Sequence, residues 1–371
     1  MVLQSHAAAF VGFLSFQTSF CCFTFALTIN DNRNLKYSNM IKVAINGFGR
    51  IGRLAFREMI NNKAFEVVAI NDLSAPAMLA YLLKYDSVQG TFKPKVTSDE
   101  NTLVIGQQKI AVYAESEPTK LPWKAHQVDL VLECTGYFST REKASAHLKA
   151  GASKVIISAP SDKSTKTIVY NVNHSTLDSN DTIISAASCT TNCLAPMAKV
   201  LHDAFGIIAG QMTTIHAYTN SQPLMDTPDA KLNFRGSRAA ANSIIPYTTG
   251  AAKAISLVIP ELKDKLDGSS QRVPVASGSV VELFTLLKKQ VSVEEINKVM
   301  KANTNASFEY TEDPIVSSDI IGINCGSLFD GSQTKVVSVG DHQMVKTVAW
   351  YDNEMSFVSQ MVRLASHFGN N

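Results

Sequence analysis

The six residues Ser188-Cys189-Thr190-Thr191-Asn192-Cys193 carry the strongest chemical signal in the chain. Ser188 is of a type that caps helices, and the stretch 194–204 is typical of the helix that would follow. A thiol in the first turn of a helix lies near the positive end of the helix dipole, which lowers its pKa toward neutrality. Because a thiolate attacks carbonyl carbon readily, Cys189 is predicted to be a nucleophile. The alternative is a small buried side chain, but hydroxyl and amide residues surround this cysteine.

A dinucleotide-binding fingerprint lies upstream of this cysteine. Residues 41–46 alternate and are β-branched, which predicts a buried strand, and Gly47-Phe48-Gly49-Arg50-Ile51-Gly52 follows as G-x-G-x-x-G before a helix ending near Ile60. Such glycines allow a tight turn, close approach of the backbone to a pyrophosphate, and close helix–strand packing. A second predicted strand, 65–71, ends at Asp72, twenty residues beyond Gly52. A carboxylate there bonds both adenosine ribose hydroxyls and repels a 2′-phosphate, so NAD is predicted rather than NADP.

Length and composition favour two domains and indicate no nucleic-acid or metal site. The chain has 371 residues, 45% of them hydrophobic, and 34 Lys and Arg against 32 Asp and Glu give a net charge of +2. A balance so close to neutral points to neither nucleic acid nor an anionic membrane. The six cysteines suggest no disulfide framework, no C-x-x-C pair or histidine cluster has metal-ligand spacing, and a reactive thiol fits a reducing cytoplasm.

Residues 1–39 differ from the rest of the sequence. The stretch 7–29 has no charged residue, and by its length it could be a signal peptide or span a bilayer. No Lys or Arg precedes it, however, and Gln17-Thr18-Ser19 interrupts its middle. Met40 stands directly before the first predicted strand, so we expect Met40 to be the biological start and residues 1–39 to be no part of the fold.

The remaining sequence predicts an α/β protein in two parts. Within 40–188, strands such as 128–133 and 155–158 alternate with helical segments, as in a Rossmann-type doubly wound parallel sheet that binds NAD. Within 189–353, the predicted strands 210–217, 278–287 and 344–350 are longer, which favours an α+β catalytic domain with a mixed or antiparallel sheet.

Three further segments have predicted roles in this architecture. Ser292 and Glu295 form a capping box for a helix to about Ala302. The C-terminal helix, about 354–371, has apolar residues at 357, 361, 364 and 368 and is expected to pack back on the first domain. The loop 218–238 is too long to lack a function in a compact domain.

Other residue types suit a base and a set of anion ligands. An activated cysteine needs a base, and His216 ends a predicted strand, where side chains reach a site. Spacing gives His216 only a weak claim, since most histidines lie on surfaces or in satisfied cores. Hydroxyl, backbone N–H and guanidinium groups suit oxyanions, and the candidates are Thr219, Thr248-Thr249-Gly250, Arg235, Arg238 and Arg272, each of which could equally be an ordinary surface residue.

From Met40 onward the chain resembles the phosphorylating glyceraldehyde-3-phosphate dehydrogenases of bacterial type. The matching segments follow one another over nearly all of 40–371, and they are INGFGRIGR (45–53), AIND (69–72), KVIISAP (154–160), SCTTNCLAP (188–196), TTIHAYT (213–219), TTGAAKA (248–254) and WYDNE (350–354). The segment SCTTNC is highly specific for this family.

The resemblance implies a role for each candidate residue. Cys189 would be the nucleophile, and His216 would raise its reactivity and act as acid and base. The residues implied to hold NAD are Gly47, Gly49, Arg50, Ile51, Gly52 and Asp72, with Ser116 at the adenine and Ser158 and Asn353 at the nicotinamide. Two anion sites, for substrate phosphate and inorganic phosphate, are implied for Ser188, Cys189, Thr190, Thr219, Arg235, Thr249, Gly250 and Arg272. The family is tetrameric, and 218–238 resembles its S-shaped loop, which reaches a neighbouring subunit's cofactor.

The sequence departs from the family at three places. Ser116 stands where many members have Arg or Lys, although the adenine contact there is largely from the main chain. The loop 218–238 is less densely basic than in many bacterial members, and Arg235 is assigned by its spacing from Arg238. Nothing in the family resembles residues 1–39.

The implied reaction is the oxidation of D-glyceraldehyde 3-phosphate to 1,3-bisphosphoglycerate with NAD and inorganic phosphate, through a cysteine hemithioacetal and thioester. This is a glycolytic step, expected of a cytoplasmic homotetramer without metal. One alternative is the related erythrose-4-phosphate dehydrogenase, against which the TTGAAKA match argues. Another is a surface-displayed binding or adhesion protein that uses the N-terminal segment as an anchor.

Overall fold

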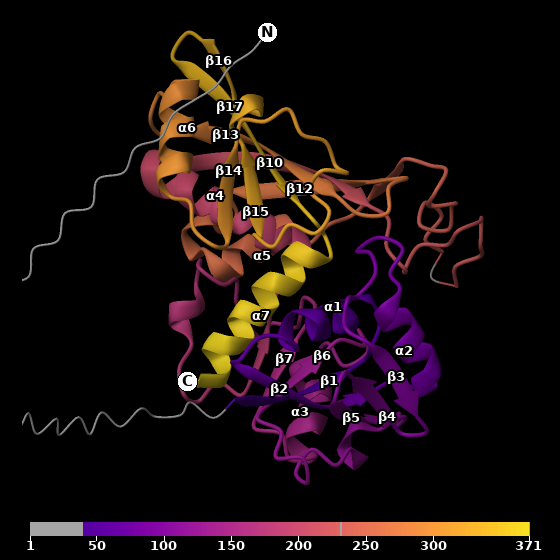
Figure 1. The fold of residues 1–371 in the computed structure, drawn as a ribbon. Coiled ribbons are helices and arrows are strands. Elements are labelled where there is room, and N and C mark those ends of the chain that lie inside the picture. The colour runs from indigo at the N-terminus through magenta and orange to yellow at the C-terminus, as the bar shows by residue number, and fades with distance from the viewer. Residues whose placement is uncertain (1–39, 231, 371) are drawn as a thin grey trace, which may run out of the picture. The chain divides into compact units, whose positions relative to one another are not determined.

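The computed structural model describes residues 40–230 and 232–370, which form two sheets with helices packed on them (Figure 1). The interpretation of residues 1–39, on which the expected start at Met40 depends, concerns residues outside those described. Within the described ranges, no helix has the length and apolar character needed to cross a membrane.

The first sheet has nine strands in the order β3-β4-β5-β2-β1-β6-β7-β9-β8. The strands from β5 to β8 in this order pair in parallel, and β3 and β4 form an antiparallel edge. Its strands are β1 (Ile41–Asn46), β2 (Phe65–Asn71), β3 (Val96–Asp99), β4 (Thr102–Ile105), β5 (Gln108–Tyr113), β6 (Leu130–Glu133), β7 (Lys154–Ile157), β8 (Lys166–Thr167) and β9 (Ile183–Ser185). The helices connecting them are α1 (Arg50–Met59), α2 (Pro76–Lys84) and α3 (Arg141–Lys149). This is the predicted doubly wound parallel sheet, and its order reverses between β1 and β6.

The second sheet has eight strands in the order β11-β12-β10-β13-β17-β15-β14, with β16 paired to β17. Two of its pairs are parallel, β10 with β12 and β14 with β15, and the others are antiparallel, so the sheet is mixed as predicted. Its strands are β10 (Ile207–Ala217), β11 (Ile245–Tyr247), β12 (Leu266–Val273), β13 (Ser279–Leu287), β14 (Phe308–Thr311), β15 (Ser327–Asp330), β16 (Lys335–Val339) and β17 (His342–Tyr351). The helices of this part are α4 (Cys189–Phe205), α5 (Ala251–Val258) and α6 (Val293–Ala302).

Local sequence signals account for several element ends. The Ser292 hydroxyl accepts a hydrogen bond from Glu295 N–H, and the Glu295 carboxylate accepts one from Ser292 N–H, so the predicted capping box opens α6. Helix α3 begins at Arg141, because the Thr140 side chain caps it by accepting from Lys143 N–H. Helix α4 begins at Cys189 with Ser188 as its cap, which confirms the predicted cap and the predicted place of Cys189 in the first turn.

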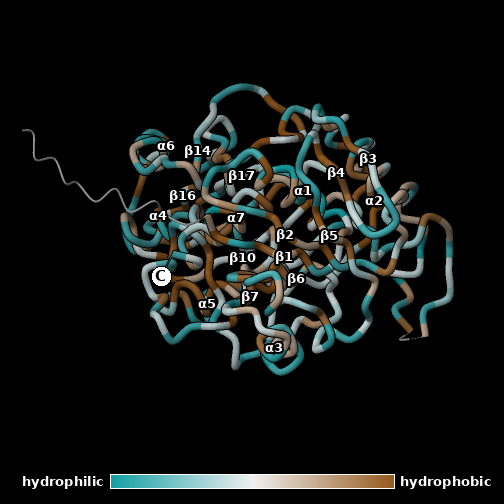
Figure 2. Tube along the Cα trace, turned by 60° about the horizontal axis from the view of Figure 1, so that its bottom comes forward, coloured by the Kyte–Doolittle hydropathy of each residue, from teal (hydrophilic) through white to brown (hydrophobic). Residues whose placement is uncertain are grey.

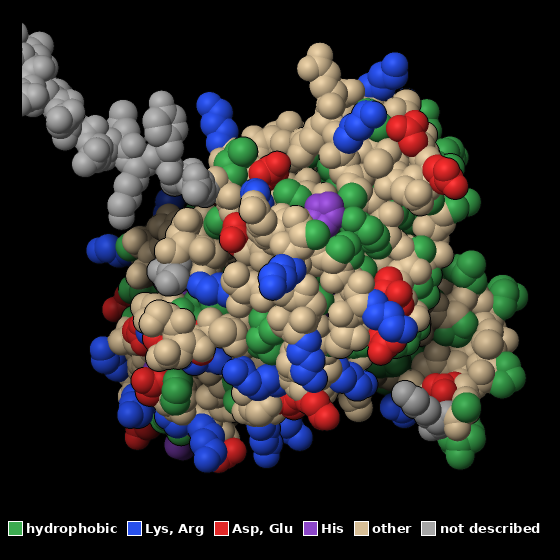
Figure 3. All heavy atoms as spheres, turned by 90° about the horizontal axis from the view of Figure 1, so that it is seen from below, with side chains coloured by type: hydrophobic (Ala, Val, Ile, Leu, Met, Phe, Trp, Pro, Cys, Tyr) green, Lys and Arg blue, Asp and Glu red, His purple; other side chains and the backbone are tan. Residues whose placement is uncertain are grey.

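The last helix, α7 (Met355–Asn370), completes the core of the first sheet. Its apolar side chains Phe357, Met361, Leu364 and Phe368 lie in one buried cluster with Ile41, Val43 and Ile45 of β1 and with residues of α1. Figure 2 shows the hydrophobic segments gathered along the central strands and the hydrophilic ones in the outer loops. On the face seen from below, basic and acidic side chains are interspersed (Figure 3).

Candidate active site

Cys189 lies at the start of α4, directly after a tight turn from β9. Ala187 in this turn has φ of +62°, a left-handed conformation that non-glycine residues rarely adopt. The Ser188 hydroxyl then accepts a hydrogen bond from Thr191 N–H at 3.1 Å, and the Asn192 amide donates to Ala186 O at 2.8 Å. These contacts hold the strained turn and aim the first residue of the helix, Cys189, toward the second sheet.

His216 approaches the cysteine from the end of β10. Its Nε2 lies 3.3 Å from Cys189 Sγ, and its Nδ1 lies 2.6 Å from Ala217 O and 2.9 Å from Arg272 Nη1. When Nδ1–H donates to Ala217 O, Nε2 is free to accept the thiol proton. Once Nε2 takes that proton the ring is an imidazolium, and its Nδ1–H still donates to Ala217 O. The contact with Ala217 O therefore suits His216 as a base both before and after the proton transfer, whereas acceptance from Arg272 belongs to the other neutral tautomer.

Burial governs the ionisation of this pair. Burial raises the pKa of the Cys189 thiol, and the positive charge of Arg272 acts in the opposite direction. Burial, and then the charge of Arg272, lower the pKa of His216 to about 4. The expectation that the thiol pKa falls toward neutrality is therefore wrong in direction, because the loss of hydration at this site outweighs the positive charge of Arg272. The arrangement favours a neutral thiol beside a neutral imidazole, ready for proton transfer.

Tyr351, for which the sequence predicted no role, lies against this pair. Its hydroxyl is 2.9 Å from Thr190 Oγ1 and 2.7 Å from Thr214 Oγ1, and its ring meets that of His216 edge-on at 5.8 Å. Tyr351 is fully buried at the end of β17. It joins the helix of the cysteine to the strand of the histidine, and its place at a strand end inside WYDNE was the signal that could have identified it.

Arg272 is the predicted anion ligand that the structure places nearest to the pair. Besides its contact with His216, its Nη1 donates to Ala217 O at 3.1 Å, and its guanidinium lies over the Tyr247 ring at 5.4 Å. Its Nε is buried and has no hydrogen-bond partner among the described residues. A buried N–H donor without a partner is stabilised by an anion that accepts its hydrogen bond, which an apolar neighbour cannot do.

The other predicted anion ligands are less closely joined to the pair. The Thr249 hydroxyl accepts from Ala251 N–H at 3.2 Å, next to Gly250 at the start of α5, and the Thr219 hydroxyl contacts Ser221. Arg235 is exposed on the loop 218–238, which extends away from the sheets (Figure 1). Arg235 lines a surface cavity with Tyr247 and Thr248, so Tyr247 touches both this cavity and Arg272.

A separate cavity of about 510 Å³ lies at the carboxyl ends of β1, β2, β5 and β6. It is lined by Asn46, Gly47, Gly49, Asn71, Asp72, Leu73, Glu115, Ser116, Cys134, Thr135, Tyr137 and Phe138. This is the edge, beside the reversal of strand order, where doubly wound sheets bind nucleotides. The predicted residues Gly47, Gly49, Asp72 and Ser116 thus meet at one cavity.

The fingerprint glycines are required by close contacts. Gly47 has φ of +91°, and a Cβ there would lie 2.7 Å from Thr135 N. A Cβ at Gly52 would lie 2.1 Å from Gly47 O, whereas a Cβ at Gly49 would meet nothing within 4 Å. Gly47 and Gly52 therefore fold the turn, and Gly49 leaves open space beside the N-terminus of α1, which fits a pyrophosphate.

Asp72 is held by the backbone of the same turn. Its Oδ2 accepts from Phe48 N–H at 2.8 Å and its Oδ1 from Ser74 N–H at 2.9 Å, so the carboxylate is fixed at the cavity edge with further lone pairs toward it. Ile51 follows Arg50 in the first turn of α1, and the Arg50 side chain contacts Asp86 and Glu354.

Ser158 and Asn353, predicted at the nicotinamide, follow β7 and β17. Ser158 N–H donates to Glu133 O at 3.0 Å, and its side chain bonds the Cys134 thiol, whose pKa burial raises to about 12. Asn353 Oδ1 accepts from Ser279 Oγ at 3.0 Å and from Ser277 Oγ at 3.3 Å.

A buried polar network that the sequence did not predict joins Asn46 and Thr135, which line this cavity. Glu133 accepts from Asn46 Nδ2 at 2.6 Å and from Thr135 N–H at 2.8 Å, and it lies 3.0 Å from His147 Nε2. Trp123 Nε1–H donates to His147 Nδ1 at 3.0 Å, so Nδ1 is an acceptor and the ring donates to Glu133 through Nε2.

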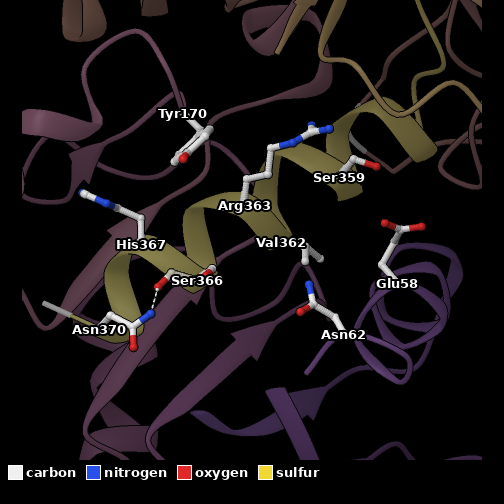
Figure 4. Close-up of a pocket in the computed structure, with 9 residues that line it drawn as sticks. All are labelled: Glu58, Asn62, Tyr170, Ser359, Val362, Arg363, Ser366, His367 and Asn370. Atoms are coloured by element: carbon white, nitrogen blue, oxygen red, sulfur yellow. Dashed lines mark hydrogen bonds between the residues drawn. The ribbon is translucent and has the colours of Figure 1, made fainter. Parts of the chain in front are cut away.

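Another cavity, along α7, shares no residue with either site (Figure 4). Glu58 faces the cavity from α1. The Tyr170 side chain, and that of His367 on α7 itself, lie on the side of the helix opposite Glu58. In 40–230 and 232–370, no three His, Cys, Asp or Glu side chains are grouped as metal ligands would be.

Comparison with known proteins matches both halves of the chain to one family. Residues 41–141 match the family model described as the glyceraldehyde 3-phosphate dehydrogenase NAD binding domain, and residues 188–353 match the C-terminal domain of the same family. The glyceraldehyde-3-phosphate dehydrogenases of Clostridium pasteurianum and Clostridium acetobutylicum are 60% and 59% identical over 329 residues, which are 89% of this chain and 98% of each relative. That of Streptococcus pyogenes is 57% identical over 330 residues, with the same coverage. The chain therefore belongs to the glyceraldehyde 3-phosphate dehydrogenase family.

Proposed function

We propose that this chain catalyses the NAD-dependent oxidative phosphorylation of D-glyceraldehyde 3-phosphate to 1,3-bisphosphoglycerate. The observation that carries the proposal is the 3.3 Å contact between Cys189 Sγ and His216 Nε2 at the start of α4, with Arg272 beside it. The family membership and the name that the relatives carry support the same reaction.

Cys189 and His216 perform the covalent steps. His216, neutral because its pKa is lowered to about 4, accepts the thiol proton as sulfur adds to the aldehyde carbon, and the proton then passes to the alkoxide to give a hemithioacetal. NAD bound in the cavity would supply the acceptor for the hydride that leaves the hemithioacetal carbon. His216 takes the hydroxyl proton at that moment, which leaves a thioester on Cys189. Inorganic phosphate then attacks the thioester carbonyl, the Cys189 thiolate leaves as 1,3-bisphosphoglycerate is released, and His216 returns its proton to that sulfur.

The anion ligands position the two phosphates at the reacting carbon. We assign this role to Ser188, Cys189, Thr190, Thr219, Arg235, Thr249, Gly250 and Arg272. The buried, unpartnered Nε of Arg272 supports it, as does the cavity that Arg235 shares with Thr248. Binding energy of the phosphate groups would orient the aldehyde carbon against the sulfur.

The cavity at the ends of β1 and β2 is proposed to hold NAD. The residues involved are Gly47, Gly49, Arg50, Ile51 and Gly52 at the pyrophosphate, Asp72 at the ribose hydroxyls, Ser116 at the adenine, and Ser158 and Asn353 at the nicotinamide. The open space at Gly49 and the fixed carboxylate of Asp72 support this assignment. Because Arg50 pairs with acidic residues, its contribution to the pyrophosphate comes from its backbone N–H.

We further propose a division into an NAD-binding domain, 40–188 with α7 packed back on it, and a catalytic domain, 189–353. A cytoplasmic homotetramer is the proposed assembly. Leu224, Met225 and Phe234 on the loop 218–238 are 74%, 75% and 78% exposed, and apolar side chains so placed favour a second subunit as their partner.

The test is NADH formation by the purified full chain. We expect activity that needs D-glyceraldehyde 3-phosphate, NAD and inorganic phosphate together, and a lower kcat/KM with erythrose 4-phosphate. A higher kcat/KM with erythrose 4-phosphate would favour the related dehydrogenase, and absence of NADH formation would refute both. Cell fractionation tests the adhesion alternative, which needs most of the protein at the membrane.

A further inference from the structure

The Arg50 side chain belongs to a charged cluster that joins three distant segments. Its Nη1 donates to Asp86 Oδ2 at 2.6 Å, its Nε donates to Glu354 Oε1 at 2.7 Å, and its Nη2 bonds Glu354 Oε2. Burial acts against the charge, but the two carboxylates outweigh it and raise the pKa of Arg50. The Asp86 side chain is 2% exposed and that of Glu354 is 15% exposed, so this is a largely buried ion triad.

The cluster continues to the residue before Asn353. Asp86 Oδ1 accepts from Val88 and Gln89 N–H, and Gln89 Nε2 in turn donates to Asp352 Oδ2 at 2.8 Å. Asp352 is fully buried, and its Oδ1 accepts from Glu354 and Met355 N–H at the start of α7. Of the two chain neighbours of Asn353, Asp352 is thus bonded directly to the segment 86–89, and Glu354 is joined to it through Arg50.

Asn353 itself is held from the second sheet. Ser277 Oγ donates to Asp352 Oδ1 at 2.7 Å and lies 3.3 Å from Asn353 Oδ1, which also accepts from Ser279 Oγ. Asn353 therefore lies between residues that are bonded to three segments: to Arg50 at the start of α1, to Gln89, and to the serines at the N-terminal end of β13. Its position depends on bonds that start at Arg50, the residue that opens α1.

We infer that Arg50 is a positioning residue: its side chain sets the place of Asn353 relative to the pyrophosphate end of the cofactor site, and so controls hydride transfer more than cofactor affinity. This inference rests on the proposed function. The guanidinium is suited to the task because its planar fork bonds both oxygens of Glu354 and still reaches Asp86, which a single ammonium group cannot do. Hydride transfer is sensitive to small displacements of the reacting groups, whereas the affinity for NAD rests on many backbone contacts.

The experiment compares Arg50→Met, Arg50→Lys, Glu354→Gln and the double variant Arg50→Met/Glu354→Gln with the unmodified full chain. We expect Arg50→Met and Glu354→Gln each to lower kcat about 10-fold or more, while the dissociation constant for NAD, measured by fluorescence quenching, rises less than about 3-fold. The double variant should be no slower than Arg50→Met, because both changes break one contact. Arg50→Lys should recover part of the rate. With C1-deuterated aldehyde, the isotope effect on kcat should rise in both single variants, because hydride transfer becomes slower.

Lys199→Met, which removes an exposed helical ion pair with Asp203, is the matched control and should change none of these values. If Arg50→Met weakens NAD binding strongly while Glu354→Gln does not, the side chain is a cofactor ligand and the inference is wrong. An unchanged kcat in both single variants would also overturn it. If Arg50→Met does not fold, Glu354→Gln and Asp86→Asn, which keep side-chain shape, decide the question. Inactivity of the unmodified chain would contradict the proposed function instead, and the NAD dissociation constants would still report on Arg50.

Discussion

The thiol–imidazole pair and the loop 218–238 are built in opposite ways. Cys189, His216 and Tyr351 are fixed by contacts between different helices and strands of the chain. Cys189 is the first residue of a capped helix that follows a strained turn. The loop is held mainly by its own short-range bonds, such as those of Arg238 with Asp226, and it exposes large apolar side chains. The difference indicates that the thiol–imidazole pair is assembled within a single chain, whereas the contacts of the loop depend on the proposed neighbouring subunit. The predictions below test that division.

The largest effect is expected at the nucleophile. Cys189→Ser should lower activity roughly 10³-fold or more, because a hydroxyl ionises far less readily than a thiol, while NAD binding and the fold persist. Cys193→Ser is the matched control. The Cys193 thiol lies one helical turn further on, buried, and bonds Ala349 O and Ser327 Oγ, so its loss should leave substantial activity. Equal losses in steady-state assays of the two variants would remove Cys189 from the chemistry.

His216→Asn should lower kcat roughly 10²- to 10³-fold through loss of the base. The variant also tests burial of the pair through pH. Because the pKa of His216 is lowered to about 4 from an unfolded value near 6.5, the unfolded chain binds more protons below about pH 6.5. Stability is therefore complete above that pH and falls as pH decreases from about 6.5 toward 4. Urea midpoints at pH 7.5 and pH 5 should differ less in His216→Asn, and an unchanged difference would show that His216 is not buried uncharged.

Of the two arginines of the proposed anion sites, Arg272 lies beside the thiol–imidazole pair and Arg235 lies on the exposed loop. Arg272→Met should raise the KM for inorganic phosphate or substrate by about 10²-fold, since buried charged hydrogen bonds are worth about 1.5–3 kcal/mol. Arg235→Met should raise it less than about 5-fold, because an exposed guanidinium binds through water-screened contacts. Initial-rate measurements at varied phosphate decide this, and the reverse order would place anion recognition on the loop.

Asp72 is intermediate between the buried pair and the exposed loop, because it is half-buried but its carboxylate is bonded to the backbone of the glycine fingerprint. The kcat/KM of the unmodified chain should be tens-fold higher with NAD than with NADP. Asp72→Ala should raise the KM for NAD about 10-fold and bring the two kcat/KM values closer together. Comparable kcat/KM for both cofactors before any substitution would contradict the role given to Asp72.

Much of the fold followed from local patterns in the sequence. The glycine fingerprint between a β-branched run and a helix predicted β1, the turn and α1, and the strand 65–71 agrees with β2 residue for residue. The capping box predicted α6. These features depend on neighbours within a few residues, so sequence reasoning reaches them.

The site could be predicted only in part, because its decisive contacts are long-range. The distance between Cys189 and His216 depends on how two strands and a helix pack, and the burial that reverses the expected thiol pKa follows from the same packing. Tyr351 and Glu133 likewise act through partners far along the chain, Thr190 and Asn46. An arginine in a fingerprint also gives no sign in sequence that it bonds Glu354, more than 300 positions away.

The packing of α7 on β1 sets an order of events during synthesis. The core beside Ile41, Val43 and Ile45 needs Phe357, Met361, Leu364 and Phe368, and Gly369 is close enough to Ile41 that an added Cβ would lie 2.6 Å from its side chain. At 5–20 residues per second, the roughly 180 residues that follow Ser188 take roughly 10–40 s to translate. During that time the apolar face that α7 will cover stays open on the nascent chain. The sheet that leaves the ribosome before the other is thus the one whose core is completed last, and chaperones have their longest opportunity to bind there.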